Sequence, residues 1–211
     1  MSRVNESFSS EWLTLLCVLL GCGYVGHRVL NVKERLEPFA DVPFASIDFR
    51  TGDVLLFQSN LALSFFLNSP YSHVGMIVRF EGETFLWEIT GRGRRATLTA
   101  VSADLNATGA VYYRRLLSPV DEDTALEHVR ANAGFTYDFS TWQHVLHNRF
   151  QNALFPRLPT PTTPSGASCA NMLGRFYQDL GMFPGKEYFL PEDFSALSGE
   201  TRWSKDQRII F

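Results

Sequence analysis

Cys169 is the residue in this sequence whose type and setting could support nucleophilic chemistry. It begins a run of apolar residues at the i, i+3, i+4, i+7 and i+11 spacing of a helix, and Ser165 and Ser168 precede it as N-capping residues. The first turn of a helix favours thiolate over thiol through the positive end of the dipole and its unpaired N–H groups. Residues 165–182 therefore predict a helix that presents a nucleophile or, alternatively, a cysteine buried in the core on the same apolar stripe.

A catalytic thiol needs a base, and the base needs an acceptor that orients it. His73 lies near the start of an expected strand, 72–80, and Glu88 lies in a second strand, 84–90, after a tight turn. With the turn centred near Gly82, the two residues fall within one or two cross-strand positions at the same end of the hairpin. The pattern thus predicts a carboxylate within reach of an imidazole. The alternatives are a core histidine and a glutamate that faces solvent.

The remaining pattern indicates an α+β fold, with a small antiparallel sheet packed on helices. Residues 49–211 are expected to form this domain, and residues 32–48, which contain Pro38 and Pro43, are expected to be a linker. Other expected strands are 51–58, 110–116 and, as an edge strand, 208–211; other expected helices are 60–67, 121–133 and 136–150.

The N-terminal segment, residues 1–31, contains a run without charged residues at 12–26. We expect a single membrane-anchor helix at about 12–30, although this run is short for a bilayer span. Positive charge lies mainly after the run, which favours a cytoplasmic position for the globular domain and makes membrane lipid an expected partner. A cleaved signal peptide and a helix buried against a protein partner are the alternatives.

The charge, cysteine content and residue spacing of the chain bear on its partners and cofactors. A formal net charge of -3 without a long basic patch gives no reason to expect nucleic acid as a partner. The three cysteines, Cys17, Cys22 and Cys169, do not make a disulfide framework. No spacing typical of a metal site is present, so we expect neither a metal nor another cofactor.

Five motifs together resemble the circularly permuted branch of the NlpC/P60 papain-like superfamily, and most closely its YiiX/YaeF-like amidases. Lecithin retinol acyltransferase-like enzymes and proteins of large DNA viruses are related to this branch. The motifs are TGDVLLFQ, YSHVGMIV, WEIT, GFTYDF and SCANMLGRFYQDLG, which fall within residues 50–182. The order histidine, acid, cysteine reverses that of ordinary papain and marks the permutation.

The resemblance implies a role for six residues. Cys169 would be the nucleophile, His73 the base, and Glu88 the residue that orients the imidazole. The implied substrate-binding residues are Tyr71, Tyr137 and Asp138. The sequence departs from the family after the cysteine, where Ala170 and Asn171 replace the usual serine and acidic residue.

The function expected from these features is a membrane-anchored papain-like cysteine hydrolase. Its substrate would carry an amide or an ester and could itself be acylated, as for an amidase, a peptidase or a lipid esterase. Two alternatives stay open. One is an acyltransferase on lipid substrates, and the other is an inactive, membrane-anchored structural component with protein partners in a larger assembly, for example a minor virion protein of a large DNA virus.

Overall fold

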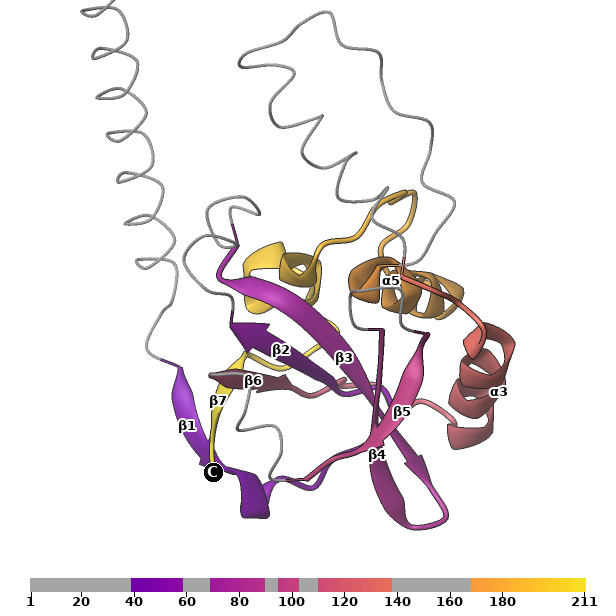
Figure 1. Ribbon diagram of the computed structural model, residues 1–211. Coiled ribbons are helices and arrows are strands. Elements are labelled where there is room, and N and C mark those ends of the chain that lie inside the picture. The colour runs from indigo at the N-terminus through magenta and orange to yellow at the C-terminus, as the bar shows by residue number, and fades with distance from the viewer. Residues whose placement is uncertain (1–38, 59–68, 90–94, 103–109, 138–167) are drawn as a thin grey trace, which may run out of the picture.

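The computed structural model describes residues 39–58, 69–89, 95–102, 110–137 and 168–211. Within these ranges the strands form one seven-stranded sheet in the order β1-β7-β6-β2-β3-β4-β5 (Figure 1). The strands are β1 Ala40–Pro43, β2 Val54–Gln58, β3 Tyr71–Phe80, β4 Glu83–Glu88, β5 Thr97–Ala100, β6 Val111–Arg114 and β7 Gln207–Ile210. The fold is therefore α+β, with a larger sheet than the sequence pattern predicted.

The hairpin expected from the sequence is present as β3 and β4. Its register pairs Met76 with Trp87 and Phe80 with Glu83. Glu81 and Gly82 both have positive φ, at 54° and 81°, so they form the tight turn. The prediction of a turn centred near Gly82 is confirmed, and the two strands carry their side chains in the expected register.

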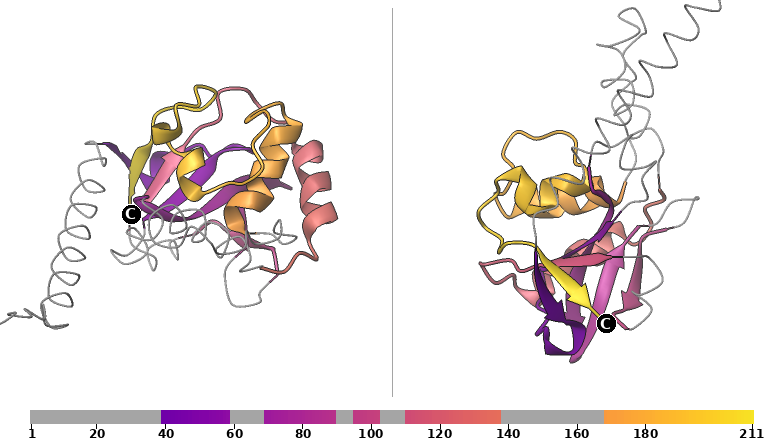
Figure 2. Two further views of the ribbon diagram at one scale, coloured as in Figure 1. Left: turned by 90° about the horizontal axis from the view of Figure 1, so that it is seen from above. Right: turned by 90° about the vertical axis from the view of Figure 1, so that its left-hand side faces the viewer.

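Two α-helices, α3 Glu122–Asn132 and α5 Cys169–Asp179, pack side by side against one face of the sheet (Figures 1 and 2). The rings of His128 and Phe176 join the helices, with centroids 5.1 Å apart. Each helix is capped at its start. Asp121 caps α3 by accepting the N–H of Thr124 at 2.9 Å, and a serine caps α5 in the same way.

Helix α5 is held against the sheet and the C-terminal segment by buried contacts. The hydroxyl of Tyr177 donates to the carbonyl of Gly52 at 2.7 Å, in the turn that leads into β2. At Gly174, an added Cβ would lie 2.2 Å from the ring of Phe189, so only glycine lets this ring pack on the helix. The opposite face of the sheet carries a second apolar cluster, which contains Phe57 and Ile77.

Two sequence-based expectations at the sheet edge differ from the structure. Residues 40–43, inside the expected linker, form β1 and pair with β7 in parallel. The C-terminal strand β7 is therefore not an edge strand, because it lies between β1 and β6. Pro43 misled the linker interpretation, since a proline is tolerated on an edge strand, where no partner needs its missing N–H.

Several expectations fall outside the described residues. These are the helix at 60–67, the membrane anchor at 12–30, and residues 138–150 of the helix expected at 136–150. The described start of that last segment is extended rather than helical, because Thr136 forms a β-bridge with Arg95. In the part of the chain that the structure describes, no helix has both the length and the apolar character needed to cross a bilayer.

Candidate active site

The structure brings Cys169, His73 and Glu88 together from α5, β3 and β4. The Nε2 atom of His73 lies 2.6 Å from Oε2 of Glu88. The imidazole of His73 lies beside the thiol of Cys169, close enough that each group shifts the pKa of the other. Since Glu88 occupies Nε2, the nitrogen left for the thiol is Nδ1. The result is a continuous thiol–imidazole–carboxylate arrangement.

Strand register explains why Glu88 reaches His73. Continuing the β3–β4 ladder from Met76 and Trp87 places Glu88 beside Gly75, two residues from His73. Residues two apart on a strand share a face, so the two side chains are diagonal neighbours. The ring of Phe57, on β2, packs against the imidazole with centroids 5.2 Å apart. The β3–β4 hairpin therefore positions the imidazole and its carboxylate acceptor without any contribution from α5.

Helix α5 places the sulfur at its first residue. Ser168 is the N-cap, and its Oγ accepts the N–H of Asn171 at 3.2 Å. The backbone amides of Val74 and Ala170 lie near the sulfur of Cys169 and lower the pKa of its thiol. The N–H of Cys169 itself lies in the first turn, where an amide has no acceptor within the helix. This amide can donate a hydrogen bond to a negatively charged oxygen on the carbon that the sulfur attacks.

The electrostatics of the pair favour thiolate and imidazolium. Burial by itself raises the pKa of the Cys169 thiol, but the neighbouring His73 imidazolium and its hydrogen bond outweigh burial and lower that pKa below its ordinary value. Burial lowers the pKa of His73, whereas Cys169 and Glu88 raise it, with a net rise to about 10. Cys169 is 6% exposed, and the side chain of His73 is 21% exposed.

The other residues implied by the resemblance are placed differently. Tyr71 is fully buried, and its hydroxyl donates to Asp206 at 2.9 Å, so its side chain lies in the core and not on an open surface. Tyr137 is half-buried and packs against the same core cluster as Cys169. Asp138 lies outside the described residues.

The two residues that follow Cys169, Ala170 and Asn171, are both buried. The backbone amide of Ala170 lies near the sulfur of Cys169. Asn171 accepts the backbone N–H of Phe189 through Oδ1 at 2.7 Å, which ties the start of α5 to the C-terminal segment. Asn171 therefore has a structural partner that an acidic residue at this position could also have bound.

Sequence reasoning missed a buried polar cluster beside the site. Asp206 accepts the hydroxyl of Tyr71 and lies 3.4 Å from Nε of Arg114. All three side chains are buried. The one available signal was Arg114 itself, because an arginine inside an otherwise apolar strand needs a buried partner. The sequence pattern did not show which residue that partner would be.

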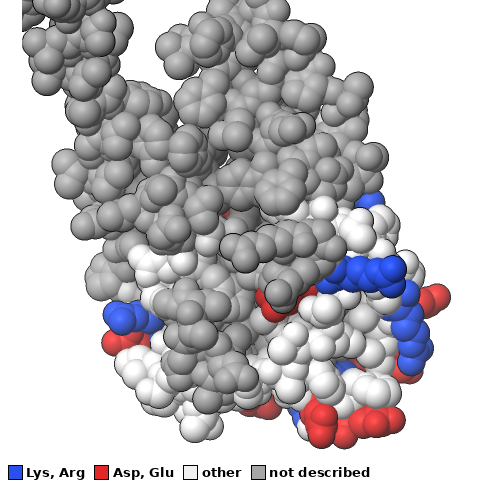
Figure 3. Space-filling view, viewed as in Figure 1, with Lys and Arg blue, Asp and Glu red and all other residues white. Residues whose placement is uncertain are grey.

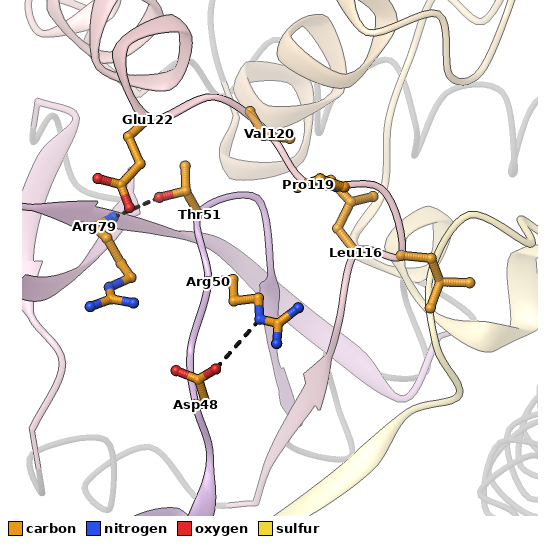
Figure 4. A pocket seen from close by; sticks show the side chains of 9 residues that line it. Asp48, Arg50, Thr51, Arg79, Leu116, Pro119, Val120 and Glu122 are labelled. Atoms are coloured by element: carbon orange, nitrogen blue, oxygen red, sulfur yellow. Dashed lines mark hydrogen bonds and ion pairs between the residues drawn. The ribbon is translucent and has the colours of Figure 1, made fainter.

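A cavity of about 290 Å³ lies elsewhere, at the far end of β3 (Figure 4). Arg79, which lines it, stands six residues beyond His73 along the strand, or roughly 20 Å at the rise of a β-strand. Its lining mixes both signs of charge, and Arg50 pairs with Asp48 at 3.5 Å. Basic and acidic side chains both appear among the described residues on the face shown in Figure 3. This cavity is separate from the thiol and its partners.

Within the described ranges, no group of three or more His, Cys, Asp or Glu side chains is arranged to hold a metal ion. No family model matches the sequence, and no curated protein matches it. Among solved structures, the fold is similar to the crystal structure of the metalloprotein YiiX from Escherichia coli O157:H7. The two chains share 20% identity with a TM-score of 0.43, over 75% of this chain and 96% of that chain.

Proposed function

We propose that this protein is a cysteine hydrolase of the permuted papain-like type, which acts on an amide or an ester through an acyl-enzyme at Cys169. One observation carries the proposal, namely the contact of a thiol, an imidazole and a carboxylate in a continuous arrangement. The order of these residues in the chain, with histidine and acid before cysteine, supports the permuted type. Core histidines and core cysteines need no such contact with each other.

In the first half of the reaction, the thiolate of Cys169 attacks the carbonyl carbon of the substrate and forms a tetrahedral intermediate. The carbonyl electron pair moves to oxygen, and the N–H of Cys169 at the helix start donates to this oxyanion. As the intermediate collapses, the carbon–nitrogen or carbon–oxygen bond breaks. The imidazolium of His73 gives its proton to the leaving amine or alcohol, which leaves an acyl thioester.

In the second half, neutral His73 takes a proton from water, and the hydroxide attacks the thioester carbonyl. The carbon–sulfur bond breaks, the acid is released, and the thiolate–imidazolium pair is restored. Glu88 holds the imidazole through Nε2 and stabilises its charged form throughout. Its position requires no movement between the two halves.

We also propose that residues 12–30 anchor the enzyme to a membrane and that the domain faces the cytoplasm. The charge-free run at 12–26 and the positive charges that follow it support this location. Alkaline carbonate extraction of cell membranes tests the anchor: the full chain should stay with the membrane, and a chain lacking residues 1–31 should not. Release of the full chain by carbonate would overturn the anchor.

Trapping of the acyl-enzyme tests the hydrolase directly. The full chain in detergent, with Cys17 and Cys22 replaced by serine, is mixed with p-nitrophenyl esters of increasing acyl length. We expect nitrophenolate release and an acyl mass on the Cys169 peptide. Cys169→Ala should show neither, and His73→Ala should slow acylation on the order of 10²–10⁴-fold. Undiminished release from Cys169→Ala, or no acyl mass on Cys169, would rule out the mechanism.

The fate of the acyl group separates hydrolysis from transfer. With an added amine or lysophospholipid acceptor, hydrolysis predicts that labelled acyl groups appear as free acid. Label that moves to the acceptor would replace hydrolase with acyltransferase while keeping the same thioester. A chain that forms no thioester with any ester would fit the structural, membrane-anchored role instead.

A further inference from the structure

Tyr71 lies two residues before His73 and reaches the C-terminal segment. We infer that Tyr71 and Asp206 are positioning residues that hold the start of β3, and with it the imidazole of His73, against Cys169. The inference rests on the proposed function, because it concerns the same thiol–imidazole pair. It replaces the expectation that Tyr71 binds substrate, since this side chain has no exposed surface.

A register shift in β3 makes the position of His73 sensitive to Tyr71. Phe57 pairs with His73, but the next residue of β2, Gln58, pairs with Tyr71, so that Ser72 is skipped. Without this extra residue, Tyr71 and His73 would point to the same side of the strand. With it, Tyr71 joins Val74 in the core cluster below the helices.

The hydroxyl of Tyr71 anchors this irregular strand end to a rigid acceptor. It donates to Oδ2 of Asp206 at 2.9 Å. The other carboxylate oxygen accepts the N–H of Ala196 at 2.8 Å and lies 3.4 Å from Nε of Arg114. The guanidinium of Arg114 also donates to three backbone carbonyls, those of Phe194, Glu200 and Ser204. Asp206 is therefore fixed from several directions, and its position determines where Tyr71 can lie.

Loss of the Tyr71 hydroxyl releases the start of β3, which is the end of the strand that carries His73. The imidazole of His73 is then free to move away from Cys169, while its bond to Glu88 can follow the movement. A thiol that loses its imidazolium partner is left with burial, which disfavours thiolate, opposed only by the weaker effect of the backbone amides of Val74 and Ala170. The expected signature is a changed pH profile of the thiol, which a general loss of stability does not produce.

Tyr113 offers a matched control. Its hydroxyl donates to Oδ2 of a buried carboxylate, Asp53, at 2.8 Å, and its side chain is also buried. It belongs to the apolar cluster on the opposite face of the sheet. Tyr113→Phe and Tyr71→Phe thus delete the same atom and the same kind of hydrogen bond to a carboxylate, although the hydroxyl of Tyr113 also accepts Nε–H of Arg115 at 2.7 Å. Only Tyr71 lies on β3, the strand that carries His73.

The experiment measures the rate of Cys169 carboxamidomethylation by iodoacetamide from pH 5 to pH 10, in the full chain with Cys17 and Cys22 replaced by serine. Wild type should show a midpoint below that of an ordinary thiol. Tyr71→Phe should raise the midpoint by about one pH unit, which is roughly tenfold less thiolate at neutral pH. Tyr113→Phe should leave the midpoint unchanged. Circular dichroism checks that each variant is folded.

Asp206→Asn gives a second test if Tyr71→Phe does not fold, because it keeps the size of the acceptor and removes its charge. The inference is overturned if wild type has a low midpoint and both Tyr71→Phe and Asp206→Asn keep it. A wild-type midpoint no lower than that of an ordinary thiol overturns the proposed function itself. The two failures are therefore distinguishable in one set of curves.

Discussion

The two faces of the sheet carry the same polar chemistry but differ in what lies beside it. Each face has a buried carboxylate that accepts a tyrosine hydroxyl and lies near an arginine. The two clusters are Asp206, Tyr71 and Arg114 on one face and Asp53, Tyr113 and Arg115 on the other. Tyr71 of the first belongs to the same apolar cluster as Cys169, and Asp53 of the second lies in the turn into β2.

The comparison separates polar burial from catalytic chemistry. Burial raises the pKa of both carboxyls, Asp53 and Asp206, so a shifted carboxyl pKa does not tell the two faces apart. The oxygens of Asp53 have structural partners, since they accept the N–H groups of Arg50 and Leu116 at 2.9 Å each. What distinguishes the face with Cys169 is the opposite movement of two pKa values, lowered at Cys169 and raised at His73.

Removal of the carboxylate of Asp206 or of Asp53 should have the largest effect on the free energy of unfolding. Asp206→Ala leaves Arg114 buried without its counter-charge, and we expect a loss of about 3–5 kcal/mol in the free energy of unfolding. Asp53→Ala leaves two backbone N–H groups and the O–H donor of Tyr113 without their acceptor, at about 1–3 kcal/mol for each buried donor. Urea denaturation measures both losses.

Only Asp206→Ala should also change the pH profile of Cys169 alkylation. Where an alanine variant does not fold, the asparagine variant at the same position takes its place. An equal change of the profile in the Asp53 variant would show that the two clusters are not functionally distinct.

Replacement of Glu88 by glutamine gives an intermediate effect. The amide can still accept from His73, but without the negative charge it supports the imidazolium less well. A hydrogen bond to a charged group exceeds a neutral one by about 1–1.5 kcal/mol, so we expect roughly tenfold slower alkylation of Cys169 at pH 7. Glu83→Gln is the control, because Glu83 is exposed at the other end of the same strand. Equal rates in the two variants would remove Glu88 from the site.

Removal of a helix cap should have the smallest effect on the free energy of unfolding and on the thiol pKa. Ser168→Ala removes the cap of α5, at a cost of about 1 kcal/mol in the free energy of unfolding, and should raise the thiol pKa slightly by loosening the first turn. Asp121→Ala removes the corresponding cap of α3, which carries no reactive residue. Thermal unfolding and alkylation of both variants test this. A shift of the thiol pKa by the Asp121 variant would show that the effect is not local to α5.

Local patterns predicted the parts of the site that depend on neighbours in the sequence. The turn at Gly82 fixed the hairpin register, and that register placed Glu88 within reach of His73. The apolar spacing after Cys169 predicted α5, although the structure begins the helix at Cys169 and ends it at Asp179. Both predictions rest on backbone chemistry that acts over a few residues.

Contacts between distant segments could not be predicted in this way. Tyr71 and Asp206 are 135 positions apart, and neither has a pattern that names the other. Likewise β5 was missed, because it has only four residues and all of them are exposed. The short strand β1 is also mostly exposed, so its place in the sheet follows only from pairing with β7. Tertiary pairing decided these elements.

We propose above all that the proton shared by Cys169 and His73 resides on His73, which gives a thiolate and an imidazolium. Its most direct test is the pH dependence of Cys169 alkylation in wild type and His73→Ala, with Cys17 and Cys22 replaced by serine. We expect a wild-type rate that rises through a thiol pKa below the ordinary 9.0, because the imidazolium, whose pKa is about 10, is still charged there. In His73→Ala, only the weaker effect of the backbone amides of Val74 and Ala170 opposes burial, so the midpoint should move above that value. Identical midpoints in the two proteins would contradict a thiolate–imidazolium pair, since the imidazole would then have no influence on the thiol.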